Sequence, residues 1–215
     1  ELMLAGVSHD LRTPLTRLRL ALEFMDNDSE VTEDMVRDIE DMDAILDQFL
    51  AFIRDGRDEK PEPLLLDELV RETVAPYNQK EERVCLCLER VPAFPLRRVS
   101  LKRLLVNLLD NALRYGGQNV EVVTSLAGDD SAPYVVLSVL DRGPGIAPAE
   151  MGEIFNPFIR GDRARGGKGT GLGLAIVKRI AALHGGSVEL RNRSGGGLEA
   201  RICLPLGLLL PRDAN

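Results

Sequence analysis

The segment MVRDIEDMDAILDQFLAFI, residues 35–53, repeats an apolar residue at alternating steps of four and three positions. These positions are Met35, Ile39, Met42, Leu46, Phe49 and Ile53. Such heptad spacing is typical of a helix that packs lengthwise on other helices. Thr32, followed by Glu33 and Asp34, marks the expected start of this helix.

A helix with a similar apolar face is predicted upstream, before a turn at residues 26–30. Its apolar positions are Leu4, Val7, Leu11, Leu18, Leu22 and Met25, with Pro14 in place of one expected member. Two antiparallel helices bury only part of such faces against each other, whereas two hairpins side by side complete a four-helix bundle. The pattern therefore predicts a homodimer; packing of both helices on the rest of the same chain is the alternative.

One of the two histidines lies in this upstream helix, in the segment SHDLRTPL, residues 8–15. His9 comes two residues after an apolar position and should face water, and Thr13 returns to the same side about one helical turn later. Asp10 flanks both, and Pro14 removes a main-chain donor, so a local bend is expected. A lone surface histidine is usually inert, but these neighbours make His9, Asp10 and Thr13 candidates for chemistry.

Composition limits the class of protein. The chain has 215 residues, of which 44% are hydrophobic, and a formal net charge of −7. This size allows one large or two small packed domains, and the negative charge disfavours nonspecific binding to nucleic acid. No apolar run approaches the roughly 20 residues that span a bilayer, and no signal segment opens the chain. Because the sequence begins within a predicted helix, we expect a piece of a longer protein, with any membrane attachment in upstream segments.

Acidic residues and cysteines add two further expectations. Residues 26–59 contain 13 acidic side chains against three arginines. This acidic segment is either a solvated surface or a docking surface for a partner with basic groups. The three cysteines show no paired metal-ligand spacing, and we expect buried, reduced thiols at Cys85, Cys87 and Cys203.

A charged stretch with two prolines, residues 56–63, is typical of a linker and predicts domains at 1–58 and 59–215. Beyond it, helices are expected at 66–77, 101–115 and 172–183, and strands at 83–89, 120–126, 134–140, 187–192 and 198–204. Glycines 195–197 are the expected turn of a hairpin, so the sheet should be mixed. The expected fold class is α+β: a helical hairpin followed by an α/β sandwich with helices on one face of the sheet.

Two polar groups in this second part could bind a ligand. Asn107 and Asn111 lie four residues apart on the predicted helix 101–115, with Arg114 close by. Their amide oxygens suit a hard cation such as Mg²⁺, although exposed or capping asparagines are the plain alternative. Asp141 follows an expected strand directly, in DRGPGI, residues 141–146, where a carboxylate can accept a hydrogen bond from an exocyclic amine. Taken alone, that motif is only a tight turn.

The segment GGKGTGLGL, residues 166–174, opens the predicted helix 172–183. Glycine-rich main chain and free N–H groups at a helix start can hold phosphates. A Walker loop does not fit, because Gly169 separates Lys168 from Thr170. A dinucleotide fingerprint does not fit either, because Leu174 stands at its sixth position.

Five segments together resemble the sequence boxes of the sensor histidine kinases of bacterial two-component systems. In the usual order these are SHDLRTPL (8–15) as the H box, NLLDNA (107–112) as the N box, DRGPG (141–145) as the G1 box, FNPF (155–158) as the F box and GTGLG (169–173) as the G2 box. Residues 8–20 and 158–162 resemble the EnvZ-like osmosensor kinases in particular. The resemblance spans nearly the whole chain.

This resemblance implies a dimerisation and histidine phosphotransfer domain, followed by a catalytic domain of the histidine kinase (GHKL) type that binds ATP and Mg²⁺. Asp141 would read the adenine amine, Asn111 with Asn107 would hold Mg²⁺, and residues 155–168 would form a mobile lid. The residues that the resemblance assigns to ATP binding are Asn107, Asn111, Arg114, Tyr115, Asp141, Gly143, Gly145, Ile146, Phe155, Phe158, Arg160, Lys168, Gly169, Thr170, Gly171, Leu172 and Gly173.

The resemblance also implies a reaction. His9 attacks the γ-phosphoryl group of ATP and passes it to an aspartate in the receiver domain of an OmpR-like response regulator, while Asp10 takes or orients the imidazole proton. Thr13 would position a water for hydrolysis of the regulator's phosphoaspartate. The chain would then be the cytoplasmic portion of a bacterial inner-membrane protein, a homodimer that does not bind nucleic acid.

Two other classes share part of the pattern. An ATP-driven clamp has the same nucleotide fold but needs no histidine hairpin, and a noncatalytic scaffold predicts the loss of His9, Asn111 or Asp141, all of which are present. The second histidine, His184, precedes two glycines and is expected at a helix C-terminus, where positive charge is favourable, and not in catalysis.

Overall fold

The computed structural model describes residues 16, 18, 35–37, 39, 40, 42, 46, 58–117, 119–129, 132–159 and 171–207. The chain divides into two compact units, Glu1–Asp55 and Gly56–Asn215. No helix within the described residues is long and apolar enough to cross a membrane.

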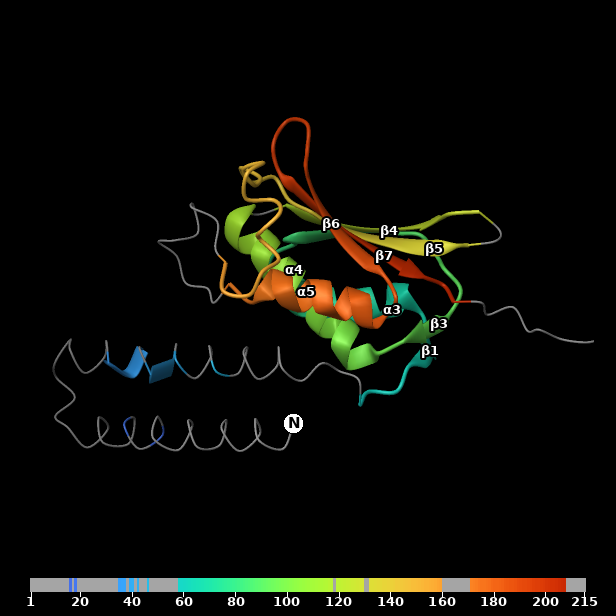
Figure 1. The fold of residues 1–215 in the computed structure, drawn as a ribbon, viewed down its shortest axis with the longest axis horizontal. Coiled ribbons are helices and arrows are strands. Elements are labelled where there is room, and N and C mark those ends of the chain that lie inside the picture. Colours follow the sequence, from blue (N-terminus) through green and yellow to red (C-terminus); the bar gives the residue numbers. More distant parts are fainter. Residues whose placement is uncertain are drawn as a thin grey trace, which may run out of the picture. The chain divides into compact units, whose positions relative to one another are not determined.

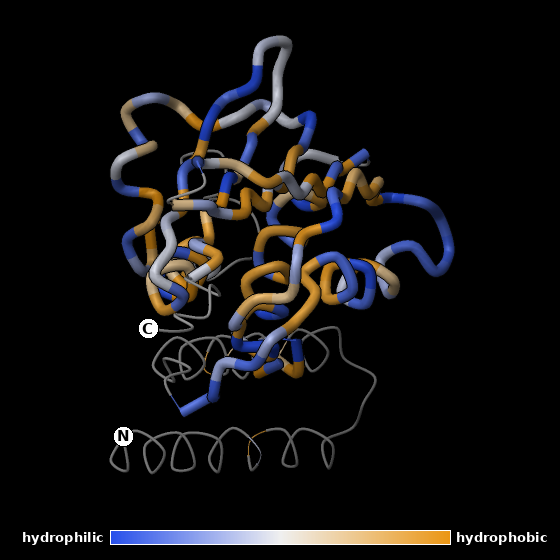
Figure 2. The backbone as a smooth tube through the Cα atoms, turned by 90° about the vertical axis from the view of Figure 1, so that its right-hand side faces the viewer, coloured by the Kyte–Doolittle hydropathy of each residue, from blue (hydrophilic) through white to orange (hydrophobic). Residues whose placement is uncertain are grey.

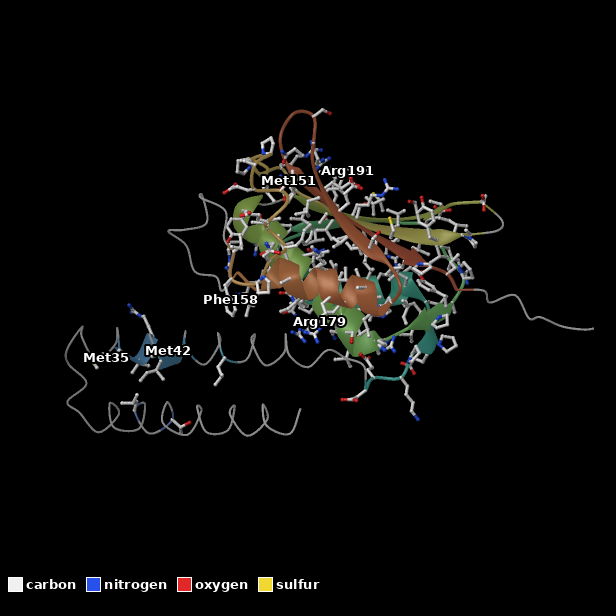
Figure 3. The ribbon with its side chains drawn as sticks, viewed as in Figure 1. Met35, Met42, Met151, Phe158, Arg179 and Arg191 are labelled. Atoms are coloured by element: carbon white, nitrogen blue, oxygen red, sulfur yellow. The ribbon has the colours of Figure 1, made fainter. Side chains whose placement is uncertain are left out.

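The described residues of the first unit are helical and include four of the heptad positions of residues 35–53. Ile39 and Leu46 are buried, with exposed fractions of 5% and 9%, whereas Met35 and Met42, labelled in Figure 3, are 50% and 46% exposed. Leu18 of the upstream apolar pattern is also exposed. Of the four heptad positions that the structure describes, two alternate ones are therefore buried and the other two face solvent.

A five-stranded mixed sheet forms the centre of the second unit. Its strand order is β2-β4-β5-β7-β6, with β2 parallel to β4 and every other neighbouring pair antiparallel. The strands are β2 (Val84–Leu88), β4 (Val120–Ala127), β5 (Tyr134–Leu140), β6 (Ser187–Asn192) and β7 (Leu198–Pro205). The predicted hairpin joins β6 to β7 through three glycines, all with positive φ, which confirms the mixed sheet.

Three helices cover one face of this sheet, as Figure 1 shows: α3 (Leu66–Val74), α4 (Arg98–Tyr115) and α5 (Gly173–Leu183). α4 packs against both α3 and α5. The core lies between the helices and the sheet, and Figure 2 shows hydrophobic residues along both layers. In β7, buried residues alternate with half-buried ones, as expected of a sheet covered on one face. The predicted α/β sandwich is confirmed.

A second, two-stranded sheet was not expected. It pairs β1 (Glu62–Leu64) with β3 (Phe94–Leu96) in antiparallel register, with Pro63 opposite Pro95. Strands of three residues are too short to show a period of two, and their prolines indicate turns or linkers. The end of the expected helix 66–77 also differs, because η1 (Ala75–Asn78) continues α3 as a 3₁₀-helix that contains Pro76.

Glu59, within the predicted linker, caps the first turn of α4. Its carboxylate accepts hydrogen bonds from the main-chain N–H groups of Val99 (2.6 Å) and Ser100 (2.9 Å) and from the Ser100 hydroxyl (2.6 Å). These N–H groups belong to the second and third residues of the helix and have no partner within it. Arg97, at the N-cap position, makes no capping hydrogen bond with its side chain. Glu59, from a distant part of the chain, provides the cap instead.

The expectation of buried cysteines was wrong. Cys85 and Cys87 are exposed, and Cys203 is half-buried. Cys85 and Cys87 share a face of the edge strand β2, as their spacing predicted, but the buried Val84 shows that the opposite face of the strand is the covered one. Alternation indicates which residues share a face, and only the tertiary fold decides which face the helices cover.

Candidate nucleotide-binding site

Asp141 is held rigidly at the end of β5 with one carboxylate oxygen to spare. The residue is 7% exposed, and its Oδ1 accepts hydrogen bonds from the N–H groups of Gly143 (2.8 Å) and Leu198 (3.0 Å). Its own N–H donates to the Leu198 carbonyl at 2.9 Å. Oδ2 accepts no hydrogen bond from any residue that the structure describes. A fixed acceptor of this kind is suited to a donor on a ligand.

The C-terminal end of α4 comes close to Asp141 because two glycines meet there. A Cβ atom on Gly116 would overlap the Asp141 side chain, and one on Gly143 would lie 2.9 Å from the Gly116 Cα. Glycine is required at Gly116, which the sequence analysis did not single out, because any side chain would displace the Asp141 carboxylate. Its place after the predicted helix was the one available signal.

Asn107 and Asn111 lie together beside the first residue of α5. A Cβ atom on Gly173 would be 3.2 Å from Asn107 Oδ1 and 3.4 Å from Asn111 Nδ2. Asn107 Nδ2 donates to the Arg103 carbonyl at 2.8 Å, which leaves Oδ1 free, and Asn111 makes no side-chain hydrogen bond within the described residues. The expected shared face is confirmed, and it places amide oxygens beside a helix N-terminus, where free N–H groups favour anions.

Further predicted site residues follow the N box on α4 or belong to the G1 box. Arg114 and Tyr115 are exposed on the last turn of α4. Gly145 has a φ of 71°, and a side chain there would overlap Asn192. Asn192 Oδ1 accepts from the N–H of Ile146 at 2.9 Å, and its Nδ2 donates to the Ile146 carbonyl at 2.7 Å. Sequence reasoning missed Asn192, because nothing in the β6 sequence marks a contact with a loop 46 residues away.

The F-box residues occupy two different settings. Phe155 is half-buried, with the Lys178 ammonium of α5 5.6 Å from its ring centroid. Phe158, labelled in Figure 3, is 57% exposed and has a φ of 66°, which is unusual for an aromatic residue. Its N–H donates to the Gly171 carbonyl at 3.0 Å. This bond joins the F box to Gly171, next to the buried Leu172 and the start of α5.

Other predicted site residues lie outside the described part of the chain, namely His9, Asp10, Thr13, Arg160, Lys168, Gly169 and Thr170. Their roles stay predictions. Within the described residues, no three His, Cys, Asp or Glu side chains gather as a metal-binding group. A cation at this site would therefore depend on amide oxygens such as those of Asn107 and Asn111 together with oxygens of the ligand, which suits Mg²⁺ bound to phosphates.

His184 lies at the C-terminal end of α5, as expected, but it does not carry a charge there. Nδ1 lies 2.8 Å from the Ile180 carbonyl, and Nε2 accepts from the Arg97 N–H at 3.0 Å, so one nitrogen donates and the other accepts. Burial is the largest influence and lowers the pKa of His184 below its usual 6.5; the nearby Arg97 charge lowers it further, against the opposing effects of Ile180 and Glu59. The expectation that His184 carries a favourable positive charge was therefore wrong. Its imidazole is neutral and has a structural role.

Comparison with known proteins agrees with this geometry. Residues 97–208 match the family described as histidine kinase-, DNA gyrase B- and HSP90-like ATPase. Residues 1–57 match the His Kinase A (phospho-acceptor) domain. The chain belongs to the sensor histidine kinases. Its two matched regions are the phospho-acceptor and ATPase domains of a bacterial two-component sensor kinase.

Curated sensor histidine kinases match over nearly the whole chain. The sensor histidine kinase GtrS of Pseudomonas aeruginosa is 38% identical over 208 residues, which are 96% of this chain and 42% of that protein. The sensor protein RstB of Escherichia coli is 36% identical over 221 residues, covering 98% of this chain and 50% of RstB. The chain therefore spans half or less of the length of these two relatives.

Solved histidine kinases have the same fold. The histidine kinase domain of the E. coli osmosensor EnvZ is 34% identical, with a TM-score of 0.56, and the match covers 74% of this chain and 98% of that domain. Full-length ShkA in complex with AMPPNP is 25% identical, with a TM-score of 0.71, over 94% of this chain and 45% of ShkA. The expected kinase fold is confirmed.

Proposed function

We propose that this sensor kinase uses Mg-ATP to phosphorylate itself on His9 and then passes the phosphoryl group to an aspartate of a response regulator. The observation that carries the proposal is the arrangement around Asp141. A carboxylate with one anchored and one spare oxygen lies near a pair of asparagines at the N-terminus of α5. The AMPPNP complex of ShkA supports a nucleotide as the ligand.

Each described group has a role that its chemistry supports. Asp141 Oδ2 accepts a hydrogen bond from the adenine amine. Asn111 and Asn107 offer amide oxygens to Mg²⁺, which offsets negative charge on the triphosphate when bound. The N-terminus of α5, with Gly169, Thr170, Gly171, Leu172 and Gly173, lies at the phosphates, and Arg160, Lys168 and the F box belong to the lid.

In the phosphoryl transfer, one imidazole nitrogen of His9 forms a bond to the γ-phosphorus while the bond to the leaving ADP oxygen breaks. Asp10 accepts or orients the proton on the other nitrogen, which keeps the attacking lone pair available. The phosphoryl group then moves from His9 to an aspartate in the receiver domain of an OmpR-like regulator. Thr13, one turn from His9, positions water for hydrolysis of that phosphoaspartate.

We also propose that residues 1–58 form a homodimeric four-helix bundle and residues 59–215 the catalytic domain. The half-exposed Met35 and Met42 support the dimer, since a second copy would cover the open members of the heptad pattern. A Met42→Glu change should dissociate the dimer in sedimentation experiments. We further propose that the chain is the cytoplasmic portion of an inner-membrane sensor.

Labelling with radioactive ATP tests the central proposal. Wild type should acquire acid-labile, base-stable phosphate in the presence of Mg²⁺ and none in EDTA. His9→Gln should abolish the label, whereas His184→Gln, which changes the only other histidine in the sequence, should retain it. Label that persists without His9 would show that the acceptor is misassigned.

The regulator-directed hydrolysis is tested separately. Thr13→Ala should retain autophosphorylation but lose hydrolysis of the phosphorylated regulator. Thr16→Ala, a change at an exposed helical position of the same unit, is the matched control and should retain both. Equal loss of both activities in Thr13→Ala would remove the special role of this hydroxyl.

A further inference from the structure

The β6–β7 hairpin grips the loop that carries Asp141 at several separate points. Besides the Leu198 contacts, Arg193 Nη1 donates to the main-chain carbonyl of Asp141 at 2.8 Å. Gly197, the last residue before β7, packs directly on this peptide, since a Cβ atom there would overlap the Asp141 carbonyl. In Figure 1 the hairpin, coloured orange to red, rises beside the loop that follows β5, and its tip projects beyond the sheet.

The Arg193 guanidinium is itself held in place. It is 17% exposed, and its Nη2 lies 3.7 Å from Glu121 Oε1 on β4. The same Glu121 oxygen pairs with Arg142 at 3.2 Å. Glu121 therefore offsets the charge of two arginines next to Asp141, and Arg193 can direct a planar donor at a main-chain carbonyl without leaving an uncompensated charge.

We propose that Arg193 is a positioning residue for recognition of the adenine base. The inference rests on the proposed function, in which Asp141 Oδ2 accepts the 6-amino hydrogen. The direction of Oδ2 depends on the orientation of the Asp141 main chain, and hydrogen bonds weaken steeply with misalignment. Arg193 holds the Asp141 main chain through its carbonyl, while Gly143 and Leu198 hold Oδ1, and the three contacts together keep Oδ2 aimed at the amine.

This role makes a prediction that a purely structural role does not. If Arg193 acts through Asp141, its loss should weaken only ligands that use the Asp141 hydrogen bond. Purine riboside triphosphate lacks the 6-amino group and otherwise resembles ATP. The ratio of the two affinities therefore measures how well Asp141 is positioned, independently of the phosphate contacts.

The experiment measures the Kd of each Mg-nucleotide by calorimetry, on the full chain with His9→Gln so that no phosphoryl transfer occurs. The parent should bind ATP at least about tenfold more tightly than purine riboside triphosphate, the effect of one hydrogen bond to a charged group. Arg193→Gln should weaken ATP binding about tenfold and change purine riboside triphosphate less than twofold. Arg193→Lys, which keeps the charge near Glu121, should give an intermediate ratio.

Arg191→Gln is the matched control. Arg191 lies two residues earlier on the hairpin and is 48% exposed. Within the described residues its ion pair is with the exposed Glu189 carboxylate, at 2.7 Å. The affinities for ATP and for purine riboside triphosphate should therefore stay unchanged. If Arg193→Gln melts too low for binding to be measured, Arg193→Lys decides the question. Equal weakening of both nucleotides would overturn the inference, whereas a parent that binds no ATP would overturn the proposed function instead.

Discussion

The two ends of the α4–α5 pair contain similar polar groups in opposite states. Near Gly173 and Gly116, Asp141 Oδ2 and the Asn111 side chain accept or donate nothing within the described residues. At the other end, Glu59 accepts three hydrogen bonds, and both nitrogens of His184 have main-chain partners. Arg97 links these two residues. Its main-chain N–H donates to His184 Nε2, and its side-chain Nε–H donates to the Glu59 main-chain carbonyl at 2.7 Å.

This difference distinguishes polar groups that can bind a ligand from polar groups that stabilise the fold. A polar group whose hydrogen bonds are all made within the protein gains nothing from a ligand, while a shielded polar atom without a partner is stabilised when a ligand supplies one. A histidine and a carboxylate close together would attract attention as a catalytic pair, but their saturated hydrogen bonds indicate a structural anchor. The following changes test this contrast, from the largest expected effect to the smallest.

Asp141→Asn should weaken ATP binding at least about 100-fold, because an amide donor would face the adenine amine in place of an acceptor. The melting temperature should change little, since the remaining carbonyl oxygen can accept from Gly143 and Leu198. Calorimetry and thermal unfolding measure the two effects. Asp110→Asn, a change on the exposed side of α4, is the control, and comparable loss of ATP binding there would contradict the assignment.

Glu59→Ala should destabilise the catalytic unit by about 1–2 kcal/mol, the typical effect of losing a helix cap. For a unit of this size that lowers Tm by about 3–6 °C. Glu68→Ala, a change of another carboxylate without a helix-capping contact in the described structure, provides a control. At a temperature where the variant stays folded, its ATP affinity should match that of wild type. A large loss of affinity would contradict a purely structural role for Glu59.

The stability of the catalytic unit should fall as pH drops below about 6.5, through His184. Its folded-state pKa is lowered, so the unfolded chain binds the proton first, and the contribution present above 6.5 is lost as pH falls toward the folded pKa. Protonation would place a hydrogen on Nε2 and break the hydrogen bond that this atom accepts from the Arg97 N–H. The nearby Glu59 carboxylate offsets this loss only in part. Tm of wild type and His184→Gln, measured from pH 7.5 to 5.5, should converge; parallel profiles would show that His184 is not the titrating group.

Glu72→Gln should leave Tm and ATP affinity unchanged. Glu72 pairs with Arg98 and Lys102, at 2.8 and 3.0 Å, and these bonds lower the pKa of its carboxyl. All three side chains are well exposed, and exposed ion pairs contribute little net stability. A measurable loss would show that α4 depends on more than the Glu59 cap at this end.

The sequence predicted features that follow from local spacing. The four-residue step places Asn107 and Asn111 together, and the strand before Asp141 places its carboxylate at a sheet end. The features that it did not predict depend on distant contacts. Glu59 caps a helix 40 residues later in the chain, and Asn192 holds a loop 46 residues earlier. The neutral state of His184 follows from burial against Arg97, which no local pattern indicates.

The hydrogen bond from Phe158 to Gly171 uses no side-chain atom of the F box. It ties the chain together on both sides of residues 159–170, next to α5. Because the bond joins main-chain atoms only, a change of the Phe158 side chain should leave the F box tied to Gly171 and the start of α5.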